Sequence, residues 1–391
     1  MDGERAAMNV LLVTRDVRVL REGSMEHAAL KERAASVKRL VVVVLNTRRD
    51  WHRVEKVSES LWIFPTNGYL RTFNPILALL IAQREVYFQG RLQTDLISGD
   101  DALTAGFTAW LVAMRYRRPL HIHIESDVLS ERYMWSGLIN AMRALFARFV
   151  VQQAHALRAG SEAVRGAIAE LSALLAERTI VTPLYLDVDS VQRDVTSVDL
   201  RAKYPTFKFI LLCASPLVRS QNVPAALSVL AGILRIYPHA GLVIVGRGPR
   251  RWRLWLQARR LGLSERVAFE KKSDNLASYF KTAHVFIQTS PYEEHDNTIA
   301  RAAAAGCAVV TTNVGSAPAI IEDNVSGFIC ESGDPACFVR NITSMIKHTD
   351  VRERIRLNGM LAVQRYMNTD KDQRMRQYID SWQMALKESE E

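Results

Sequence analysis

Short apolar runs that alternate with helix-forming segments are the feature that most limits how this chain can fold. The runs Asn9–Thr14 and Leu40–Leu45 begin the pattern, and Phe209–Ala214 and Gly241–Val245 restart it in the second half. Most of these runs end in a turn that is followed by a helical pattern. Strands that are apolar throughout, with helices between them, are typical of parallel sheets covered by helices. The chain is therefore predicted to be an α/β protein with doubly wound sheets.

The length and the restart of the pattern together predict two domains. A chain of 391 residues is too long for one ordinary hydrophobic core. The segment Pro183–Asp199, which is rich in Asp and Val, is interpreted as the linker. We therefore expect a Rossmann-like domain over residues 1–185 and a second over residues 186–391. The second is expected to include a closing C-terminal helix, Asp370–Leu386.

The charge balance allows several kinds of anionic partner. Lys and Arg outnumber Asp and Glu by 51 to 41, which gives a net charge of +10. Such a charge suits nucleic acid, an anionic membrane or an anionic substrate. The cations occur in small scattered groups, for example over 115–118 and 250–253, without a known nucleic-acid motif. We expect most of them to be solvated and expect no nucleic-acid partner. Peripheral contact with an anionic membrane is the alternative.

No segment is expected to cross a membrane or to act as a signal peptide. Apolar runs such as Pro75–Ala82 and Leu103–Met114 are interrupted well before the roughly 18 residues that a spanning helix needs. The first residues do not form a cationic region followed by an apolar one. A cytoplasmic location is therefore expected, with the inner membrane face as a peripheral alternative.

The cysteines and two histidines are predicted to be structural. The histidines, His121 and His123, point to one face of a strand and lack metal-ligand spacing. The cysteines show no CxxC pattern, lie in or beside apolar strands and are expected to be buried free thiols. They are Cys213, Cys307, Cys330 and Cys337.

The stretch Thr289–Gly315 has the pattern of a ligand-binding turn. A strand end is followed by an acidic loop, a short Ala-rich helix closed by Gly306, and a buried strand. Asp296 is placed to cap the helix through its first free backbone N–H groups, and Gly306 suits the left-handed residue after a helix. Such a helix start is a natural place for phosphate or sugar hydroxyls.

This stretch resembles the donor-sugar site of the family 4 (group 1) retaining glycosyltransferases, whose fold is GT-B. The family pattern is roughly Glu-Gly-Phe-x-Asn-x-x-x-Glu-Ala-x-Ala-x-Gly, and Glu293, Asn297 and Gly306 match it. Gly246-Arg247-Gly248-Pro249, after an apolar strand, resembles the family's Val-Gly-x-Gly-Pro turn. The resemblance covers essentially the whole chain and is strongest over 209–330. It implies two facing Rossmann-like domains.

Four positions depart from the family pattern. Glu125 stands in place of a histidine, Pro216 of an arginine, Gln221 of a lysine and Arg301 of a glutamate. Arg301 cannot accept a hydrogen bond, so it either pairs with the acidic loop or contacts an extra phosphate. Arg219 lies in the same loop as Pro216 and either reaches the donor diphosphate in its place or is a solvent-exposed cation.

The resemblance implies a set of site residues and no metal or cofactor besides the nucleotide sugar. The residues that it assigns to the reacting sugar and leaving diphosphate are Glu293, Arg219, Glu125 and Asp127. Those that it assigns to donor binding are Gly23, Gln221, Gly246, Gly248, Pro249, Lys271, Asn297, Thr298, Ile299 and Arg301.

Two functions are consistent with these residues. The first is a retaining glycosyltransferase of polysaccharide biosynthesis, which moves a hexose from a nucleotide sugar to a glycan, lipid-linked or small-molecule acceptor. The second is a non-catalytic (pseudoenzyme) homologue that acts as a protein partner or glycan-binding scaffold. The first is the function that we expect, and the second is the alternative. The argument for the alternative is the loss of two clamp cations and one ribose acceptor, because charge stabilisation is usually the largest catalytic effect.

Overall fold

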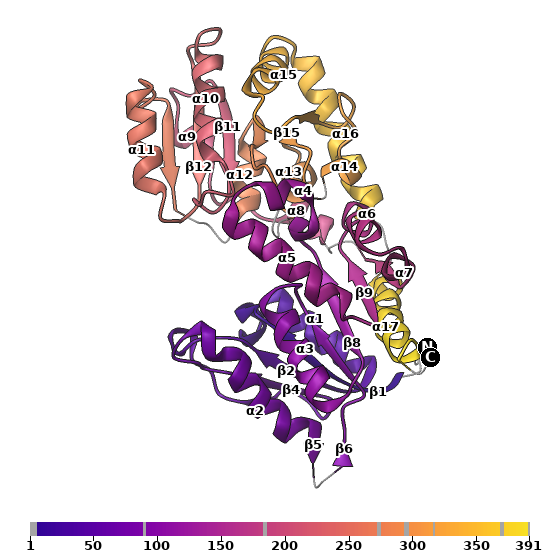
Figure 1. Ribbon diagram of the computed structural model, residues 1–391. Helices are drawn as coiled ribbons and strands as arrows, with labels where there is room; N and C mark the ends of the chain where they lie inside the picture. The colour runs from indigo at the N-terminus through magenta and orange to yellow at the C-terminus, as the bar shows by residue number, and fades with distance from the viewer. Residues whose placement is uncertain are drawn as a thin grey trace. The chain divides into compact units, whose positions relative to one another are not determined.

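The computed structural model describes residues 6–88, 91–182, 186–271, 275–292, 297–315, 317–367 and 371–389. The chain forms two compact units, one of residues 1–183 with 370–391 and the other of residues 184–369. Each unit has a largely parallel sheet with helices on both of its faces (Figure 1). The prediction of a two-domain α/β protein is confirmed.

The first unit contains an eight-stranded sheet among its described residues, in the order β10-β9-β8-β7-β1-β2-β4-β3. All pairs are parallel except that of β3 with β4. The strands of this sheet are β1 (Ala6–Thr14), β2 (Val37–Val44), β3 (Glu55–Lys56), β4 (Leu61–Pro65), β7 (Leu96–Gly99), β8 (Leu120–Ile124), β9 (Ala156–Ala159) and β10 (Thr179–Val181). A separate antiparallel pair is formed by β5 (Tyr87–Phe88) and β6 (Arg91–Leu92).

Serine side chains begin several helices of the first unit. Ser24, Ser130 and Ser161 each accept a hydrogen bond from a backbone N–H of the first helical turn, which would otherwise lack a partner. The helices are η1 (Val17–Leu20), α1 (Met25–Ala35), η2 (Arg48–Asp50), η3 (Arg71–Phe73), α2 (Asn74–Val86), α3 (Thr104–Tyr116), η4 (Asp127–Leu129), α4 (Glu131–Trp135), α5 (Leu138–Gln152), α6 (Glu162–Leu171), α7 (Ala173–Glu177) and α17 (Lys371–Lys387).

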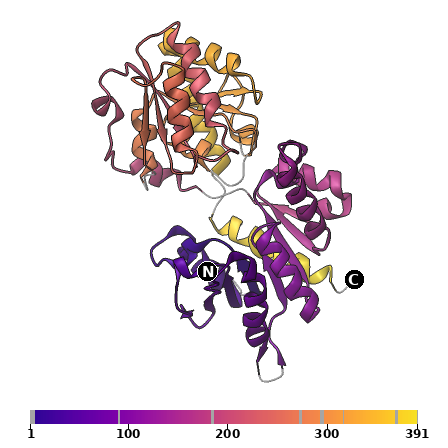
Figure 2. The ribbon, with the colours of Figure 1, turned by 60° about the vertical axis from the view of Figure 1, so that its left-hand side comes forward.

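The C-terminal helix α17 packs on the first unit. Tyr378 and Trp382 share a hydrophobic cluster with Val10 and Leu40 of the first sheet. The indole N–H of Trp382 donates to the hydroxyl of Ser98 at 3.2 Å. Figure 2 shows the helix, in yellow, lying along this unit. The expectation that residues 186–391 form one domain is therefore corrected at its C-terminal end.

The described residues of the second unit form a six-stranded parallel sheet in the order β13-β12-β11-β14-β15-β16. Its strands are β11 (Phe209–Ala214), β12 (Ala240–Val245), β13 (Val267–Glu270), β14 (Val285–Gln288), β15 (Ala308–Thr312) and β16 (Phe328–Cys330). Its helices are α8 (Val188–Arg193), α9 (Leu200–Lys203), α10 (Val223–Leu234), α11 (Arg251–Arg260), α12 (Leu276–Thr282), α13 (Thr298–Ala304), α14 (Ala317–Ile320), α15 (Pro335–Lys347) and α16 (Thr349–Met367).

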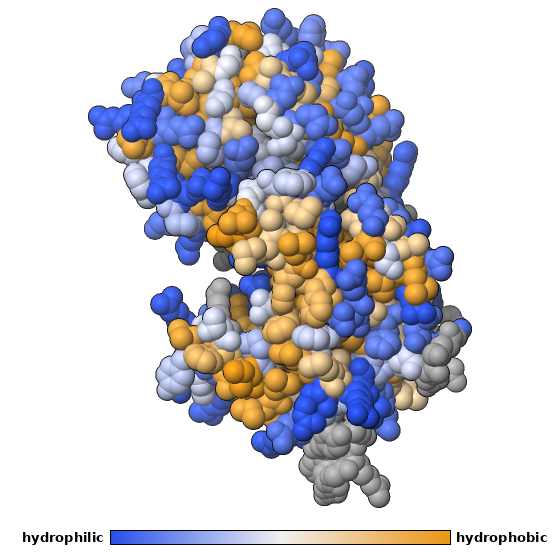
Figure 3. All heavy atoms as spheres, in the orientation of Figure 1, coloured by the Kyte–Doolittle hydropathy of each residue, from blue (hydrophilic) through white to orange (hydrophobic). Residues whose placement is uncertain are grey.

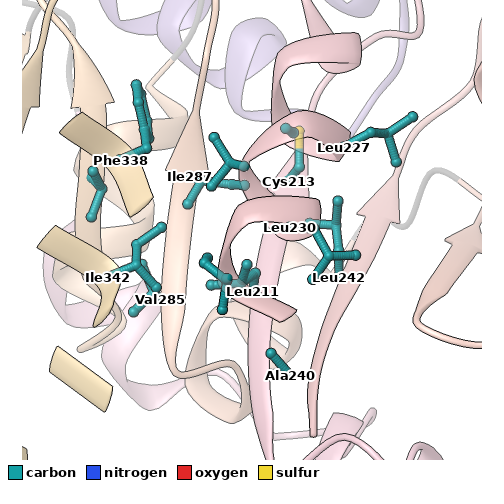
Figure 4. Packing of buried hydrophobic residues seen from close by; sticks show 14 of the residues in the cluster. Leu211, Cys213, Leu227, Leu230, Ala240, Leu242, Val285, Ile287, Phe338 and Ile342 are labelled. Atoms are coloured by element: carbon teal, nitrogen blue, oxygen red, sulfur yellow. The ribbon is translucent and has the colours of Figure 1, made fainter. Parts of the chain in front are cut away.

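Both faces of the second sheet are buried, which explains why its strands are apolar throughout. Leu211 faces a cluster with Leu230 of α10 and Ile342 of α15 (Figure 4). The next residue, Leu212, faces a second cluster on the other side of the sheet. Val191 of α8 belongs to that second cluster, so the expected linker over 183–199 is in part a packed element of the second unit.

The expectation that all four cysteines are free thiols is wrong for one pair. Cys330 and Cys337 form a disulfide, with their Cα atoms 5.8 Å apart. The pair is brought together because α15 begins beside the end of β16, with Asp334 capping its first turn through the N–H of Cys337. Cys213 and Cys307 are free and buried, and burial raises the pKa of each thiol to about 12.

Candidate functional site

In the second unit, two loops meet at the point where the strand order reverses. Because the strands are parallel, the loops after β11 and β14 lie at one edge of the sheet, and these neighbouring strands are followed by connections that run in opposite directions. Such a switch point is where open α/β sheets bind ligands. The hydroxyl of Thr289, after β14, donates to the carbonyl of Asn222 at 3.0 Å. This bond joins the two loops at the candidate site.

The glycine turn after β12 packs directly against the loop after β11. A Cβ atom on Gly246 would lie 2.0 Å from the carbonyl oxygen of Ser215, and one on Gly248 would lie 2.4 Å from that of Leu217. The N–H of Leu217 donates to the carbonyl of Arg247 at 2.9 Å. The glycines are thus required by the contact between the two loops. The predicted approach of this turn to a donor stays a prediction.

Several residues of the predicted donor site lie at or near the surface of the second unit. Pro216 and Arg219 are exposed, and Gln221 is half-buried. Lys271, directly after β13, and Pro249 are also exposed. The loop after β11 lacks the two cations of the family pattern. Arg219 is its one arginine or lysine.

The start of α13 follows the same edge of the sheet. Asn297, Thr298 and Ile299 are buried there, and the N–H of Arg301 donates to the carbonyl of Asn297 at 2.8 Å. The Nε atom of Arg301 is buried and has no hydrogen-bond partner among the described residues. Residues 293–296 lie outside those residues, so the role of Glu293, the capping by Asp296 and the pairing of Arg301 stay predictions.

A carboxylate that the sequence did not single out ends β13. Glu270 accepts a hydrogen bond from the Tyr204 hydroxyl and lies 2.5 Å from the Nζ of Lys203. Burial by itself raises the pKa of Glu270, but the bonds from Lys203 and Tyr204 outweigh it and lower that pKa. These contacts bind α9 to the sheet, and we assign Glu270 a structural role.

In the first unit, charged side chains gather at the carboxyl ends of neighbouring strands. The two ring nitrogens of His123 on β8 lie 3.2 Å from an oxygen of Asp100 and 3.4 Å from an oxygen of Glu125. The hydroxyl of Thr14 on β1 donates to Asp100 at 3.1 Å. Arg158 of β9 lies behind them and is only 4% exposed. We call Asp100, His123, Glu125 and Arg158 the charged cluster.

Burial and neighbouring charges both shift the pKa values of Asp100 and His123 in the charged cluster. Burial by itself raises the pKa of Asp100, but the hydrogen bond with His123 and the charges of Arg33 and Arg158 hold it well below its usual range. Burial, followed by the charge of Arg158, lowers the pKa of His123 and outweighs the carboxylates of Glu125 and Asp100, which act to raise it. Asp100 is therefore ionised at neutral pH, and His123 lies between two carboxyl groups.

The guanidinium groups near the cluster are held by the C-terminal helix. The guanidinium carbon of Arg158 lies 3.6 Å from the centre of the Tyr378 ring, and that of Arg33 lies 4.3 Å from it. Sequence analysis did not find Asp100 or Arg158, because their partners come from distant strands and from α17. The available signal was the polar turn Gly99-Asp100-Asp101 at a strand end.

The remaining predicted residues of the first unit lie in the turns at the same edge. Gly23 has φ +81° and precedes α1, and a Cβ atom on it would have nothing within 4 Å. Asp127 begins η4. His121 contacts the hydroxyl of Ser98 at 2.9 Å, in agreement with the structural role predicted for it. His123, by contrast, contacts the predicted site residue Glu125 directly.

A cavity at the opposite edge of the second sheet contains none of these residues. It has a volume of about 400 Å³ and is lined by Arg201, Lys281, His284, Arg352 and Arg356, among others. Arg201 precedes β11, Lys281 and His284 precede β14, and the last two arginines lie on α16. The cavity is therefore separate from the candidate site.

Comparison with known proteins supports the fold and the class. The model of the family described as glycosyl transferases group 1 matches residues 200–361. The solved structure of HepE from Anabaena in complex with UDP-glucose is similar, with a TM-score of 0.73, 19% identity and coverage of 95% of this chain and 98% of that one. Sucrose-phosphate synthase from Thermosynechococcus elongatus has a TM-score of 0.76 at 16% identity, over 96% and 98% of the chains. The fold is GT-B, as predicted.

A curated relative is similar over a shorter stretch. N-acetyl-alpha-D-glucosaminyl L-malate synthase from Bacillus anthracis is 24% identical over 216 residues, which are 54% of this chain and 56% of that protein. The chain therefore spans little more than half of this relative. None of the described helices is both long enough and apolar enough to cross a bilayer.

Proposed function

We propose that this protein is a retaining family 4 glycosyltransferase that transfers a hexose from a nucleotide sugar, without a metal. The observation that carries the proposal is the switch point of the second sheet, where the loop after β11 contacts both the glycine turn after β12 and Thr289, in the segment that leads to α13. The match to the group 1 family over residues 200–361 supports it. So does the similarity to HepE, which was solved with UDP-glucose.

The leaving diphosphate is proposed to lie at the start of α13. Its negative charge grows in the transition state, so nearby cations that are fixed in place lower the barrier. Arg219, Arg247 and Lys271 are exposed cations at this edge of the sheet. Arg301 is not assigned to the diphosphate: its buried Nε, which has no hydrogen-bond partner among the described residues, would suit an additional phosphate on the donor. Glu293 is proposed to position the sugar.

The first unit is proposed to supply the acceptor side. Glu125 and Asp127 are proposed to contact a sugar hydroxyl, and Gly23, where an added Cβ atom would have nothing within 4 Å, is proposed to leave room for the ligand. His123 holds Glu125 from one side while Asp100 holds His123 from the other. A carboxylate fixed in this way is pre-oriented for a hydroxyl group. The acceptor class is a glycan, a lipid-linked sugar or a small molecule.

Donor hydrolysis and transfer assays test the proposal. UDP-, GDP- and ADP-sugars are offered to the wild type and to Arg219→Ala and Glu293→Ala. Both variants are expected to lose at least tenfold in rate, because each removes a group that is proposed to face the reacting bond. Arg253→Ala, which removes an exposed arginine from α11, is the matched control. Undiminished activity in both site variants would refute the assignment of these residues.

The second candidate, a non-catalytic homologue, is favoured by one specific observation. The loop after β11 presents Pro216 and Gln221 where the family has two cations, and only Arg219 remains there. If this loop cannot hold a diphosphate, no nucleotide will stabilise the fold. A thermal melt with UDP, GDP and ADP distinguishes the two candidates, because a ligand that binds only the folded state raises Tm. No shift with any of the three would support the partner or scaffold role.

A further inference from the structure

A broad apolar surface lies on the helices that cover one face of the first sheet. On α5 the side chains of Leu138, Ile139 and Met142 are 80%, 70% and 65% exposed, and Trp135 at the end of α4 is 80% exposed. Figure 3 shows hydrophobic residues gathered over these helices. Single exposed apolar residues are ordinary, but a contiguous patch marks an interaction surface. We call Trp135, Leu138, Ile139, Met142, Leu145 and Phe149 the α5 face.

Aromatic contacts extend the α5 face across the neighbouring helix. The ring of Phe149 meets that of Trp110 on α3 edge-on at 5.2 Å, and the rings of Phe107 and Phe146 lie 5.1 Å apart. The inner side of α5, with Ala147 and other small or branched residues, is buried against the unit. The exposed apolar side chains are thus surplus to the core.

The charged groups of α3 and α5 are all of one sign, while α4, which ends in Trp135, carries one of each sign, the exposed Glu131 and Arg132. Neither α3 nor α5 contains an Asp or a Glu. Arg115 at the end of α3, Arg117 directly after it and Arg143 on α5 are exposed. The apolar surface is therefore flanked by cations that have no carboxylates on the same helices.

We propose that the α5 face docks on an anionic phospholipid surface. Its aliphatic side chains enter the boundary between headgroups and acyl chains, where Trp135 finds the interface that indole rings prefer. Arg115, Arg117 and Arg143 bind lipid phosphates, which match the fork of a guanidinium group. The net charge of +10 adds a long-range attraction to the same surface.

A second copy of the chain is a poorer occupant of the same surface. A two-fold interface places the same patch on both copies, so the arginines of one copy would face those of the other. Neither α3 nor α5 supplies a carboxylate to offset that repulsion. An anionic membrane provides the missing charge and covers the apolar side chains at the same time.

Sedimentation with vesicles tests the docking without any transfer reaction, so its outcome is independent of the proposed function. The full chain is spun with vesicles of phosphatidylcholine alone and of phosphatidylcholine with phosphatidylglycerol at about 3:1. We expect binding to the anionic vesicles, weaker binding to the neutral ones, and a loss on raising the salt. The double variant Ile139→Ser/Met142→Ser should bind about tenfold more weakly. Arg143→Glu should lose most of the preference for anionic vesicles.

A matched control lies on α11. Trp255 is 53% exposed beside Arg259, so Trp255→Ser removes a similar surface aromatic elsewhere. Its binding should equal that of the wild type. Loss of binding in Trp255→Ser alone would transfer the membrane contact to α11 and overturn the proposal. A concentration-dependent dimer that Ile139→Ser/Met142→Ser dissolves, without vesicle binding by the wild type, would assign the surface to a second copy. Unchanged Tm in each variant shows that the fold is intact.

Discussion

The charged residues of the two candidate regions are held in different ways. In the first unit, His123 lies within 3.4 Å of two carboxylates, and Arg158 is buried against the ring of Tyr378. In the second unit, Arg219 and Lys271 stand on exposed loops. A buried charge must be paired, so the first cluster is organised by the fold itself. Exposed cations cost the fold little, because water solvates their charge.

Replacing Asp100 should produce the largest effect of any single substitution at neutral pH. Asp100→Ala leaves His123, Arg33 and Arg158 without their shared counter-charge, and the free energy of unfolding should fall by roughly 3 kcal/mol. Urea unfolding followed by circular dichroism measures it. The surface control Glu162→Ala removes a carboxylate that is 73% exposed and should change stability by less than about 0.5 kcal/mol. Equal losses in both variants would show that the cluster is not a preorganised unit.

Acidification should destabilise both units through histidines that are neutral in the folded state. Burial, with Arg201 and Arg352, lowers the pKa of His284 in the second unit to about 4, and burial with Arg158 lowers that of His123. In the unfolded chain each of these histidines takes up a proton near pH 6.5, whereas in the folded chain each stays neutral to a lower pH. The stabilisation that each neutral histidine provides is therefore complete above about pH 6.5. It falls as the pH drops, by at most about 1.4 kcal/mol per pH unit for each histidine.

Substitution of a histidine in one unit tests how much of the pH effect that unit contributes. His284→Gln should flatten the decline between about pH 6.5 and 4, because a glutamine does not titrate. Asp100 adds a later loss, since its lowered pKa means that its stabilisation is present above about pH 3.9 and disappears below it. Thermal melts at a series of pH values measure these slopes. A decline of the same slope in His284→Gln would remove that histidine as its cause.

Enlarging the glycine turn should have a smaller effect, confined to the second unit. In Gly248→Ala the new Cβ atom would lie 2.4 Å from the carbonyl of Leu217. The two loops must then separate, at a cost of about 1–3 kcal/mol, and any nucleotide binding should weaken with them. Gly166→Ala on α6 is the control, because nothing lies within 4 Å of its added Cβ atom. That variant should be neutral or gain up to about 1 kcal/mol.

Exchanging Arg301 should give the smallest change in free energy and the sharpest test of the second region. Arg301→Glu restores the acceptor that the family uses for ribose and removes a guanidinium that cannot accept. Binding of a plain nucleotide sugar should tighten several-fold, which is about 1 kcal/mol. Calorimetry with UDP-glucose measures it. If neither the wild type nor the variant binds, Pro216 and Gln221 have already closed the site, and the enzyme function should be abandoned.

The resemblance over the strand ends made most of the second unit predictable. The run Phe209–Ala214 is β11 as expected, and Gly246 and Gly248 lie in a turn because no other residue fits against the neighbouring loop. The charged cluster was not predictable in the same way. Glu125 was identified by its register, but Asp100 and Arg158 come from other strands, and their contact with His123 depends on the pairing of β7, β8 and β9.

The amino-acid sequence by itself determined the α/β class, the two parallel sheets and the turns that end their strands. These follow from local patterns of apolar and turn residues, which act over a few positions. Tertiary structure decided that α17 covers the first sheet, that Cys330 meets Cys337, and that α5 keeps an apolar side exposed. A periodic pattern shows that one side of a helix is apolar, but the choice of what covers that side belongs to elements far away in the chain.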